Sequence, residues 1–196
     1  MTWLFDQHEQ QYGIEELAKS TEDNFSRLNI DQQVAFKKII IAVKNNTSDI
    51  FTVDGPGGTG KTNTLLEKVR SNGDIALAVA SSGIAALLLP GDQTAHSCFK
   101  IPINIYEDST CSIKHNSDLA SLLQIAKLII WDEAPMTHRY AFEAVDKTLK
   151  DLMKAIDPLL EEKPFGGKVI VFGGDFCQIL PVVIKGNCED IIGFCL

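Results

Sequence analysis

The sequence predicts an α/β domain, in which a parallel β-sheet is covered by helices on both faces. Four short apolar runs alternate with segments of helical periodicity, the order expected when a crossover helix follows each strand. Each run is apolar throughout, as in strands buried on both sides. Glycine-rich or acidic residues directly follow three of the runs, and sheets of this class bind ligands at the carboxyl ends of their strands.

The first elements are helical. Residues 1–25 are polar and predict an arm or a short helix packed on the domain edge. LNIDQQVAFKKIIIAV (28–43) predicts a helix capped by Asp31. The apolar positions of this helix are Val34, Phe36, Ile39, Ile40 and Val43.

Each of the first two predicted strands is followed by a predicted helix. DIFTVD (49–54) predicts the first strand, which leads through a glycine-rich loop into the helix KTNTLLEKVRS (61–71). DIALAVA (74–80) predicts the second strand, and SGIAALLL (82–89) begins another helix. Residues 101–118 are polar and irregular, which is typical of an insertion or a mobile loop.

The second half repeats this alternation. AKLIIWDE (126–133) and GKVIVFGGD (167–175) predict the third and fourth strands. Between them, residues 138–156 predict an amphipathic helix. Its apolar side is formed by Phe142, Val145, Leu149, Leu152 and Ile156.

Composition narrows the class of protein. Of 196 residues, 45% are hydrophobic and 22% are charged, as in globular domains. No apolar run approaches the ~20 residues that cross a bilayer, and the first residues predict no signal peptide. The net charge of −8 argues against a broad cationic surface for nucleic acid but not against a local groove. Five cysteines without Cys-x-x-Cys spacing predict isolated, reduced thiols: Cys98, Cys111, Cys177, Cys188 and Cys195.

The stretch GPGGTGKT matches the phosphate-binding pattern G-x-x-x-x-G-K-[ST] without a mismatch. Glycines let the backbone wrap so that its N–H groups face phosphate oxygens, and the following helix adds its dipole. Lys61 is expected to reach the β- and γ-phosphates, and the Thr62 hydroxyl to bind Mg²⁺. The expected nucleotide contacts are Gly55, Pro56, Gly57, Gly58, Thr59, Gly60, Lys61 and Thr62.

Asp132 and Glu133 end the third predicted strand. A carboxylate at such a position holds Mg²⁺ through water, and a neighbouring glutamate can polarise the attacking water as a general base. Alone, the pair is also consistent with an acidic strand end of no chemical importance. Together with the glycine-rich loop, it predicts hydrolysis of a nucleoside triphosphate with Mg²⁺.

Five segments resemble, in order, motifs of the petite-integration-frequency (Pif) family of DNA helicases, in helicase superfamily one. They are LNIDQQVAF, GPGGTGKT, ASSGIAALLLPGDQTAHSCFKIP, LIIWDEAPM and GGDFCQILPV. WDEAPMTHRYAFEAVDKTLKDLM is most similar to the eukaryotic Pif-like group, which includes the helicase part of Helitron transposons. The resemblance implies a RecA-like P-loop domain over 26–184 and ATP-dependent 5′-to-3′ movement on single-stranded DNA. It also implies roles in DNA repair, recombination and telomere maintenance, in a nucleus or mitochondrion if the source is eukaryotic.

The resemblance assigns further roles. Gln32 would read the adenine edge, so ATP is favoured, and Gln178 would act with Lys61 and Glu133 in catalysis by contacting the γ-phosphate. The single-strand track would be lined by Ser82, Gly83, His96, Ser97 and Phe99. Hydroxyls and a histidine can bind phosphates, and Phe99 can stack on a base. Each also has a plainer explanation: a solvated Gln32, a helix cap at His96 and Ser97, and a core position for Phe99.

The sequence departs from the family pattern in two places. The motifs of a second lobe do not follow QILPV, and Arg27, Arg70 and Arg139 occupy no arginine-finger position. Because a missing finger costs roughly 10³–10⁵ in turnover, we expect weak nucleotide and single-stranded DNA binding, very slow hydrolysis and no unwinding. Residues 185–196 are expected to lead toward the second lobe, and no membrane is expected as a partner. Cys177 stands where relatives often carry a basic residue.

Two other functions stay open at this point. One is a P-loop ATPase or small-molecule kinase unrelated to DNA, which would place a substrate pocket in residues 101–118. The other is a degenerate, non-catalytic module that binds DNA or protein. The presence of Lys61, Thr62, Asp132, Glu133 and Gln178 argues against the degenerate module.

Overall fold

The computed structural model describes residues 14–55, 61–91 and 93–175, with the side chains of 19–55, 62–91 and 93–175. Four parallel strands form one sheet in the order β1-β4-β3-β2. They are β1 (Ile50–Asp54), β2 (Ala76–Ala80), β3 (Leu128–Asp132) and β4 (Val169–Gly174). The four strands lie within the four predicted apolar runs, and the predicted α/β class with a parallel sheet is confirmed.

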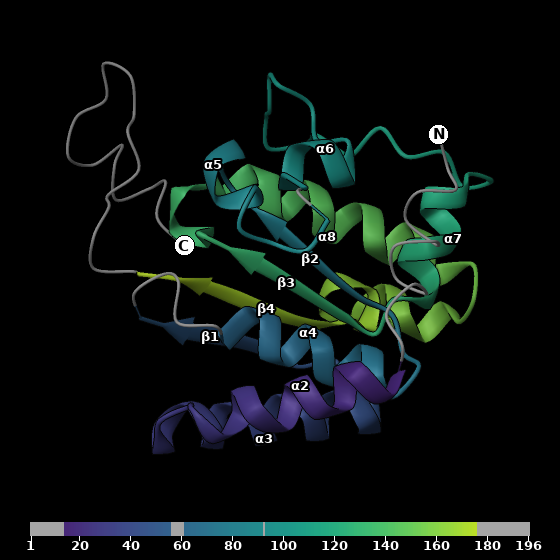
Figure 1. Ribbon diagram of the computed structural model, residues 1–196. Coiled ribbons are helices and arrows are strands. Elements are labelled where there is room, and N and C mark those ends of the chain that lie inside the picture. The colour runs from purple at the N-terminus through teal and green to yellow at the C-terminus, as the bar shows by residue number, and fades with distance from the viewer. Residues whose placement is uncertain (1–13, 56–60, 92, 176–196) are drawn as a thin grey trace.

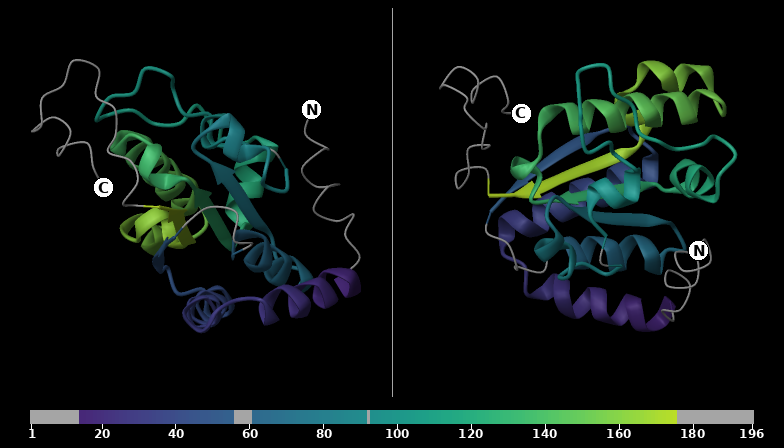
Figure 2. Two further views of the ribbon diagram at one scale, coloured as in Figure 1. Left: turned by 60° about the vertical axis from the view of Figure 1, so that its left-hand side comes forward. Right: turned by 90° about the horizontal axis from the view of Figure 1, so that it is seen from above.

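Helices cover the sheet on both faces (Figures 1 and 2). One face carries α2 (Ile14–Ser26), α3 (Ile30–Asn45) and α4 (Lys61–Ser71). The other carries α6 (Ala95–Phe99), α7 (Asp118–Ile125) and α8 (Arg139–Lys154). The short helix α5 (Gly83–Ala86) follows β2, and three 3-10 turns complete the described elements: η1 (Ala134–Met136), η2 (Pro158–Glu162) and η3 (Pro164–Gly167).

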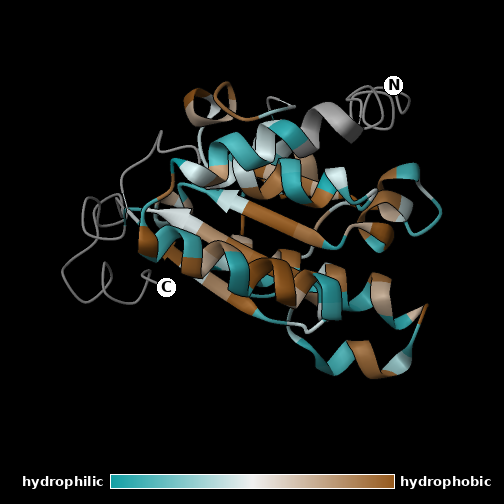
Figure 3. Cartoon of the chain, turned by 60° about the horizontal axis from the view of Figure 1, so that its bottom comes forward, coloured by the Kyte–Doolittle hydropathy of each residue, from teal (hydrophilic) through white to brown (hydrophobic). Residues whose placement is uncertain are grey.

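Side chains of β3 alternate between two cores, one on each face of the sheet. Ile129 and Trp131 pack on the α6, α7 and α8 side, whereas Leu128 and Ile130 pack on the α3 and α4 side. This is the period of two that a strand imposes, and here both sets of side chains are apolar because both faces are covered. Figure 3 shows the same arrangement as brown strands between helices striped brown and teal.

The edge strand β1 departs from the pattern of full burial. Its residues alternate between exposed and half-buried, and Ile50 is 45% exposed. Phe51 and Val53 pack against the core on the α3 and α4 side. The apolar run DIFTVD therefore forms a strand that is covered on one face only.

Three details of the predicted helices need correction. Asn29, not Asp31, caps α3, and Asp31 lies in the first turn, where a carboxylate complements the helix dipole. Val34 was predicted to face the core but is 48% exposed. The helix α8 ends at Lys154, so Ile156 lies beyond it and is 58% exposed.

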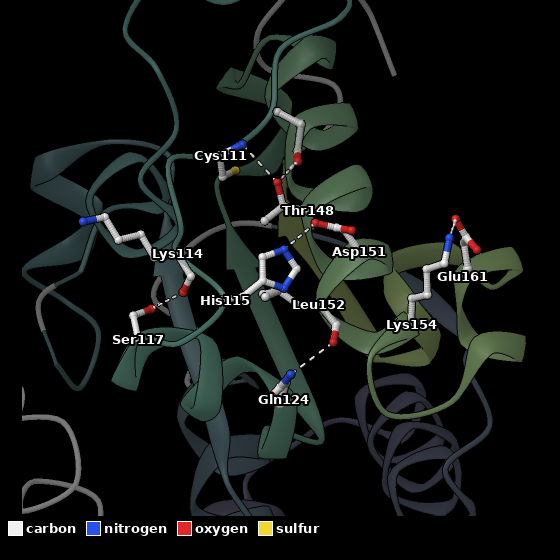
Figure 4. Close-up of polar contacts among 11 residues, drawn as sticks. Cys111, Lys114, His115, Ser117, Gln124, Thr148, Asp151, Leu152, Lys154 and Glu161 are labelled. Carbon is white, nitrogen blue, oxygen red and sulfur yellow. Dashed lines mark hydrogen bonds and ion pairs between the residues drawn. The ribbon is translucent and has the colours of Figure 1, made fainter.

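Of the segment 101–118 that is predicted to be irregular, residues 101–117 form neither helix nor strand, whereas Asp118 begins α7. Residues 101–117 are docked on α8 (Figure 4). The Cys111 N–H donates to the Thr148 hydroxyl at 2.9 Å. The His115 Nε2 lies 2.8 Å from a carboxylate oxygen of Asp151. Cys111 is itself buried in the core, so this segment is an integral part of the domain rather than a detached loop.

Cys98 and Cys111 are free and buried. Burial raises the pKa of Cys98 to about 12 and that of Cys111 to about 11. Both side chains therefore behave as small apolar groups, because a thiol that stays protonated is a poor nucleophile and metal ligand. Cys177, Cys188 and Cys195 lie outside the described residues.

Thr148→Val tests the docking of residues 101–117. Valine keeps the volume, but it removes the acceptor of the Cys111 N–H and the hydroxyl that donates to the Ala144 carbonyl. An unpaired buried N–H costs about 1–3 kcal/mol, so we expect that loss of unfolding free energy in urea and faster hydrogen exchange at the Cys111 amide. Thr148→Ser, which keeps the hydroxyl, should retain slow exchange at this amide. Equal exchange rates in the two variants would contradict the assignment.

Candidate active site

The carboxyl ends of the strands meet at one edge of the sheet, where the arrowheads of Figure 1 point. Asp54 pairs with Gly174, and Ala80 pairs with Asp132. The Gly55 N–H donates to the Gly174 carbonyl at 3.1 Å, which continues the β1–β4 alignment by one residue. Gly55, where the glycine-rich stretch begins, therefore lies at the same edge of the sheet as the acidic end of β3.

The glycine-rich loop has the local context that its motif requires. It leaves β1 at Gly55, whose φ of +141° is open to glycine but strained for other residues. The helix α4 begins at Lys61 and places Thr62, half-buried, in its first turn. Residues 56–60 and the Lys61 side chain lie outside the described part, as do Cys177 and Gln178. Strand, loop and helix follow one another as the phosphate-binding motif predicts.

Asp132 lies at the end of β3, beside β4. Its Oδ1 accepts the N–H of Glu133 at 3.1 Å. A Cβ on the adjacent Gly173 would come within 3.2 Å of the same oxygen, so glycine at that position leaves the carboxylate its space. The Asp132 side chain is thereby oriented by the strand end and by its neighbour on β4.

Glu133 adopts a left-handed backbone conformation, with φ of +53° and ψ of +37°. It caps η1, whose Pro135 packs so closely on Gly174 that a Cβ there would lie 2.6 Å from the proline Cδ. Left-handed geometry is unfavourable for a residue with a side chain and persists only where the surroundings impose it. Such strain gathers at functional sites, which fits the predicted role of this residue.

Three carboxylates gather around this turn. Burial raises the pKa of Glu133 above its usual value, and the nearby charges of Asp132 and Asp175 raise it further. A carboxylate with a raised pKa is a stronger base, as a group that takes a proton from water must be. Asp175, which ends the GGD stretch, received no role from the sequence, and the signal that could have identified it is its position directly after β4.

The donor set fits Mg²⁺ bound together with a nucleotide. Thr62 and Asp132 offer a hydroxyl and a carboxylate, the hard oxygen ligands that this ion prefers. Among the described residues, no three histidines, cysteines or acidic residues form a metal cage. Mg²⁺ does not need such a cage when phosphates and waters supply most of its coordination shell.

Gln32 takes part in the capping of α3. Its N–H donates to the Asn29 side chain at 2.8 Å, and its Oε1 accepts the Asn29 N–H at 3.0 Å. This reciprocal pair is a capping box, so Gln32 is not merely solvated. It also borders a small apolar hollow, which is lined by Leu28, Ala35, Phe36, Ile39, Val53 and Leu65.

The two segments assigned to the single-strand track both begin at the end of β2. Ser82 caps α5, accepting the Ala85 N–H at 3.1 Å, and no atom lies within 4 Å of a Cβ placed on Gly83. The second segment is held to β2 by a bridge between Thr94 and Ala80. His96 and Ser97 are exposed on α6, and the cap of α6 is Thr94 rather than either of them.

Phe99 does not belong to an exposed track. Its ring is 1% exposed and stacks on Trp131 with ring centroids 5.6 Å apart. A base could stack on this ring only if the core opened, so the expectation of base stacking is wrong for this conformation. The spacing of α6 explains the error, since Phe99 falls on the face that is turned inward while His96 and Ser97 fall on the outer face.

A family model described as PIF1-like helicase matches residues 27–196. The chain belongs to the PIF1-like helicase family. It is 34% identical over 138 residues to the ATP-dependent DNA helicase Pif1 of Psychrobacter sp. (strain PRwf-1), covering 68% of this chain and 20% of that protein. It is 30% identical over 162 residues to the ATP-dependent DNA helicase RRM3 of Saccharomyces cerevisiae, covering 79% and 21%.

A solved structure gives the same result for the fold. The chain matches Pif1 helicase from Bacteroides in complex with ADP-AlF3 and ssDNA at a TM-score of 0.62 and 30% identity, over 82% of this chain and 36% of that chain. The predicted RecA-like class is thereby confirmed. This PIF1-like chain spans about one fifth of the length of the curated relatives. In its described part, no helix has both the length and the apolar character to span a bilayer.

Glu133→Gln tests the charge crowding in this PIF1-like chain. Because the pKa of Glu133 is raised in the folded state, the folded protein binds this proton more tightly than the unfolded protein does. The ionised carboxylate therefore weakens folding at neutral pH, and this penalty disappears as pH falls below the ordinary value of 4.5. We expect the variant to raise Tm at pH 7 and to leave it unchanged near pH ~4. Glu133→Gly should add about 1 kcal/mol by relieving the left-handed backbone. A Tm below that of the unsubstituted chain for both variants would refute this.

Proposed function

We propose that this chain is the ATP-binding lobe of a DNA helicase that moves 5′ to 3′ on single-stranded DNA. The observation that carries the proposal is the meeting of three parts at one sheet edge. The glycine-rich loop leads from the end of β1 to α4, and the turn of Asp132 and Glu133, the carboxylate turn, lies at the end of β3. The helices α5 and α6 begin beside the end of β2. The proposed nucleotide site at the ends of β1 and β3 and the proposed nucleic-acid surface at the end of β2 therefore lie on adjacent strands, because β2 pairs with β3.

Each residue has a defined task in this proposal. The loop 55–60, the N-terminus of α4 and Lys61 bind the phosphates. Thr62 and Asp132 hold Mg²⁺, which neutralises charge on the phosphates when it is bound. Glu133 takes the proton of the attacking water, and Gln178 contacts the γ-phosphate.

DNA binding is assigned to the half-buried Ser82 and to the exposed Gly83, His96 and Ser97. These can contact phosphates through hydroxyl, imidazole and backbone N–H groups. The net charge of −8 predicts weak binding confined to this surface, because affinity from phosphate contacts grows with each cation that takes part. A weak grip suits a motor that must release the strand at every step.

The remainder of the motor lies beyond this lobe in the proposal. Two of the arginines serve the fold locally: Arg70 donates to the Ala76 carbonyl at 3.1 Å, and Arg139 pairs with Glu143 at 3.4 Å. We therefore assign the arginine finger to a second lobe, with residues 185–196 leading toward it, and expect slow hydrolysis and no unwinding from this chain alone. If the source is eukaryotic, we place its DNA in the nucleus or a mitochondrion, and its work in repair, recombination or telomere maintenance.

Nucleotide binding with and without DNA tests the proposal directly. We expect a fluorescent ATP analogue with Mg²⁺ to bind the purified chain, and Lys61→Ala to weaken binding at least about tenfold, since the lysine carries the charge that meets the phosphates. A short oligo-dT strand should change the affinity for the analogue. Binding that is independent of Lys61, or no binding, would reject the ATP site and favour a degenerate module.

Gln32→Glu separates helix capping from adenine reading. Glutamate at this position keeps the capping box, so the unfolding free energy should change little. It cannot donate to adenine as an amide does, so affinity for ATP should fall about tenfold, the ~1.4 kcal/mol expected of one bidentate pair. Affinity for GTP, measured in parallel, controls for the added charge. An unchanged ratio of ATP to GTP affinity would remove Gln32 from base recognition.

A further inference from the structure

Three polar groups from β3 and the end of η1 surround the hydroxyl of Ser81, at the end of β2. The Trp131 Nε1–H donates to Ser81 Oγ at 3.0 Å, and the Thr137 hydroxyl donates to the same oxygen at 2.6 Å. Ser81 in turn donates to the Asp132 carbonyl, through its hydroxyl at 3.3 Å and its N–H at 3.0 Å. We name these three side chains, Ser81, Trp131 and Thr137, the serine junction.

The hydroxyl of Ser81 is used to capacity. A serine hydroxyl donates one hydrogen bond and accepts two, and all three are made within the serine junction. Trp131 is 1% exposed and Thr137 is 6% exposed, so water cannot readily replace Ser81 as the acceptor of their protons. Buried polar groups without partners are costly, and only a small hydroxyl at residue 81 satisfies both.

The serine junction joins two parts of the proposed machinery. Ser81 directly precedes Ser82, the cap of α5 and the start of the exposed nucleic-acid segment. Its partners flank the catalytic carboxylates, since Trp131 precedes Asp132 and Thr137 closes η1 after Glu133. The Thr137 N–H also donates to the Ala134 carbonyl at 3.0 Å, so the turn that holds Glu133 in its left-handed conformation ends on this hydroxyl network.

The aromatic core holds the indole of the serine junction in place. The Trp131 ring lies 4.5 Å from that of Phe142 and 5.6 Å from that of Phe99, centroid to centroid. Phe99 belongs to α6, whose outer face carries His96 and Ser97. Both segments assigned to the DNA track therefore have a buried contact with Trp131. One contact is the hydrogen bond to Ser81, and the other is the stacking of Phe99.

We propose that Ser81 is a positioning residue through which DNA contact at the start of α5 and nucleotide binding at the carboxylate turn affect each other. The inference rests on the proposed function and deepens it, because it names the hydrogen bonds that connect the two ligand surfaces. A DNA strand that shifts Ser82 also moves the Ser81 hydroxyl. Because this hydroxyl holds Trp131 and Thr137, which flank Asp132 and Glu133, the shift reaches both carboxylates. Coupling of this kind is reciprocal, so nucleotide must alter DNA affinity by the same factor.

The test measures this coupling factor in the chain itself. The affinity for a fluorescent, non-hydrolysable ATP analogue with Mg²⁺ is determined with and without oligo-dT, and the ratio of the two is the factor. We expect at least about fivefold in the unsubstituted chain, in the usual range for coupled sites. Ser81→Ala should bring the ratio to nearly one, and Ser81→Thr, which keeps a hydroxyl, should restore it. A merely structural role would change stability without moving the ratio.

Trp131 supplies a second readout. Trp3→Phe leaves it as the single tryptophan, since the sequence has two. In this background we expect oligo-dT and Mg²⁺ with the analogue each to shift the Trp131 emission, and Ser81→Ala to abolish the shift with oligo-dT. Thr137→Val cuts only the link from Ser81 to the turn of Glu133, so it should keep that shift but lower the ratio. That variant leaves the Trp131 N–H with its acceptor, so it serves if Ser81→Ala does not fold.

The outcomes separate this inference from the proposed function. If both ligands bind but the unsubstituted chain shows a ratio near one, or if Ser81→Ala and Thr137→Val both retain the full ratio, the inference is overturned while the ATP site stands. If no Lys61-dependent nucleotide binding occurs, the proposed function fails and the inference fails with it.

Discussion

The parallel pairing of β3 with its two neighbours is the constraint on which the other features of this domain depend. Because side chains alternate across a strand, a slip of one residue would move every side chain of β3 to the opposite face. Trp131 would then leave the aromatic core and Asp132 would turn away from its present position. The observed register, Ala80 with Asp132 and Trp131 with Phe172, is held by apolar side chains on both faces. Burial of the core therefore also aligns the site.

The same edge of the sheet carries features that oppose stability. The backbone of Glu133 is in the left-handed conformation, and its side chain lies near two other carboxylates. Gly174 is packed closely against Pro135. A turn of this kind costs free energy that the buried strands must offset. Since strained and charged turns of this type are found where chemistry occurs, the conflict between local preference and global fold is itself consistent with an active site.

The short helix α6 shows how one motif can serve two surfaces. His96 and Ser97 are exposed, whereas Cys98 and Phe99 are buried. The inner face supports the indole of Trp131, and the outer face carries the two polar side chains to which we assign DNA contact. A motif that the sequence presents as a single contact surface thus divides into a buried half and an exposed half, because neighbouring residues of a helix point about 100° apart.

Much of the architecture follows from the sequence alone. The apolar runs, the match at Gly55–Thr62 and the carboxylates after LIIW determine the strands, the loop and the edge where they meet, because parallel strands bring their carboxyl ends together. Tertiary structure decided what periodicity leaves open. Only packing shows that Phe99 lies against Trp131 and that residues 101–117 are held by Thr148. The pairing of Gln32 with Asn29 is different, because a capping box joins residues three positions apart and can be read from the sequence. Ser81, Trp131 and Thr137 meet only in space, since hydrogen bonds between residues 50 or more positions apart leave no pattern in the linear sequence.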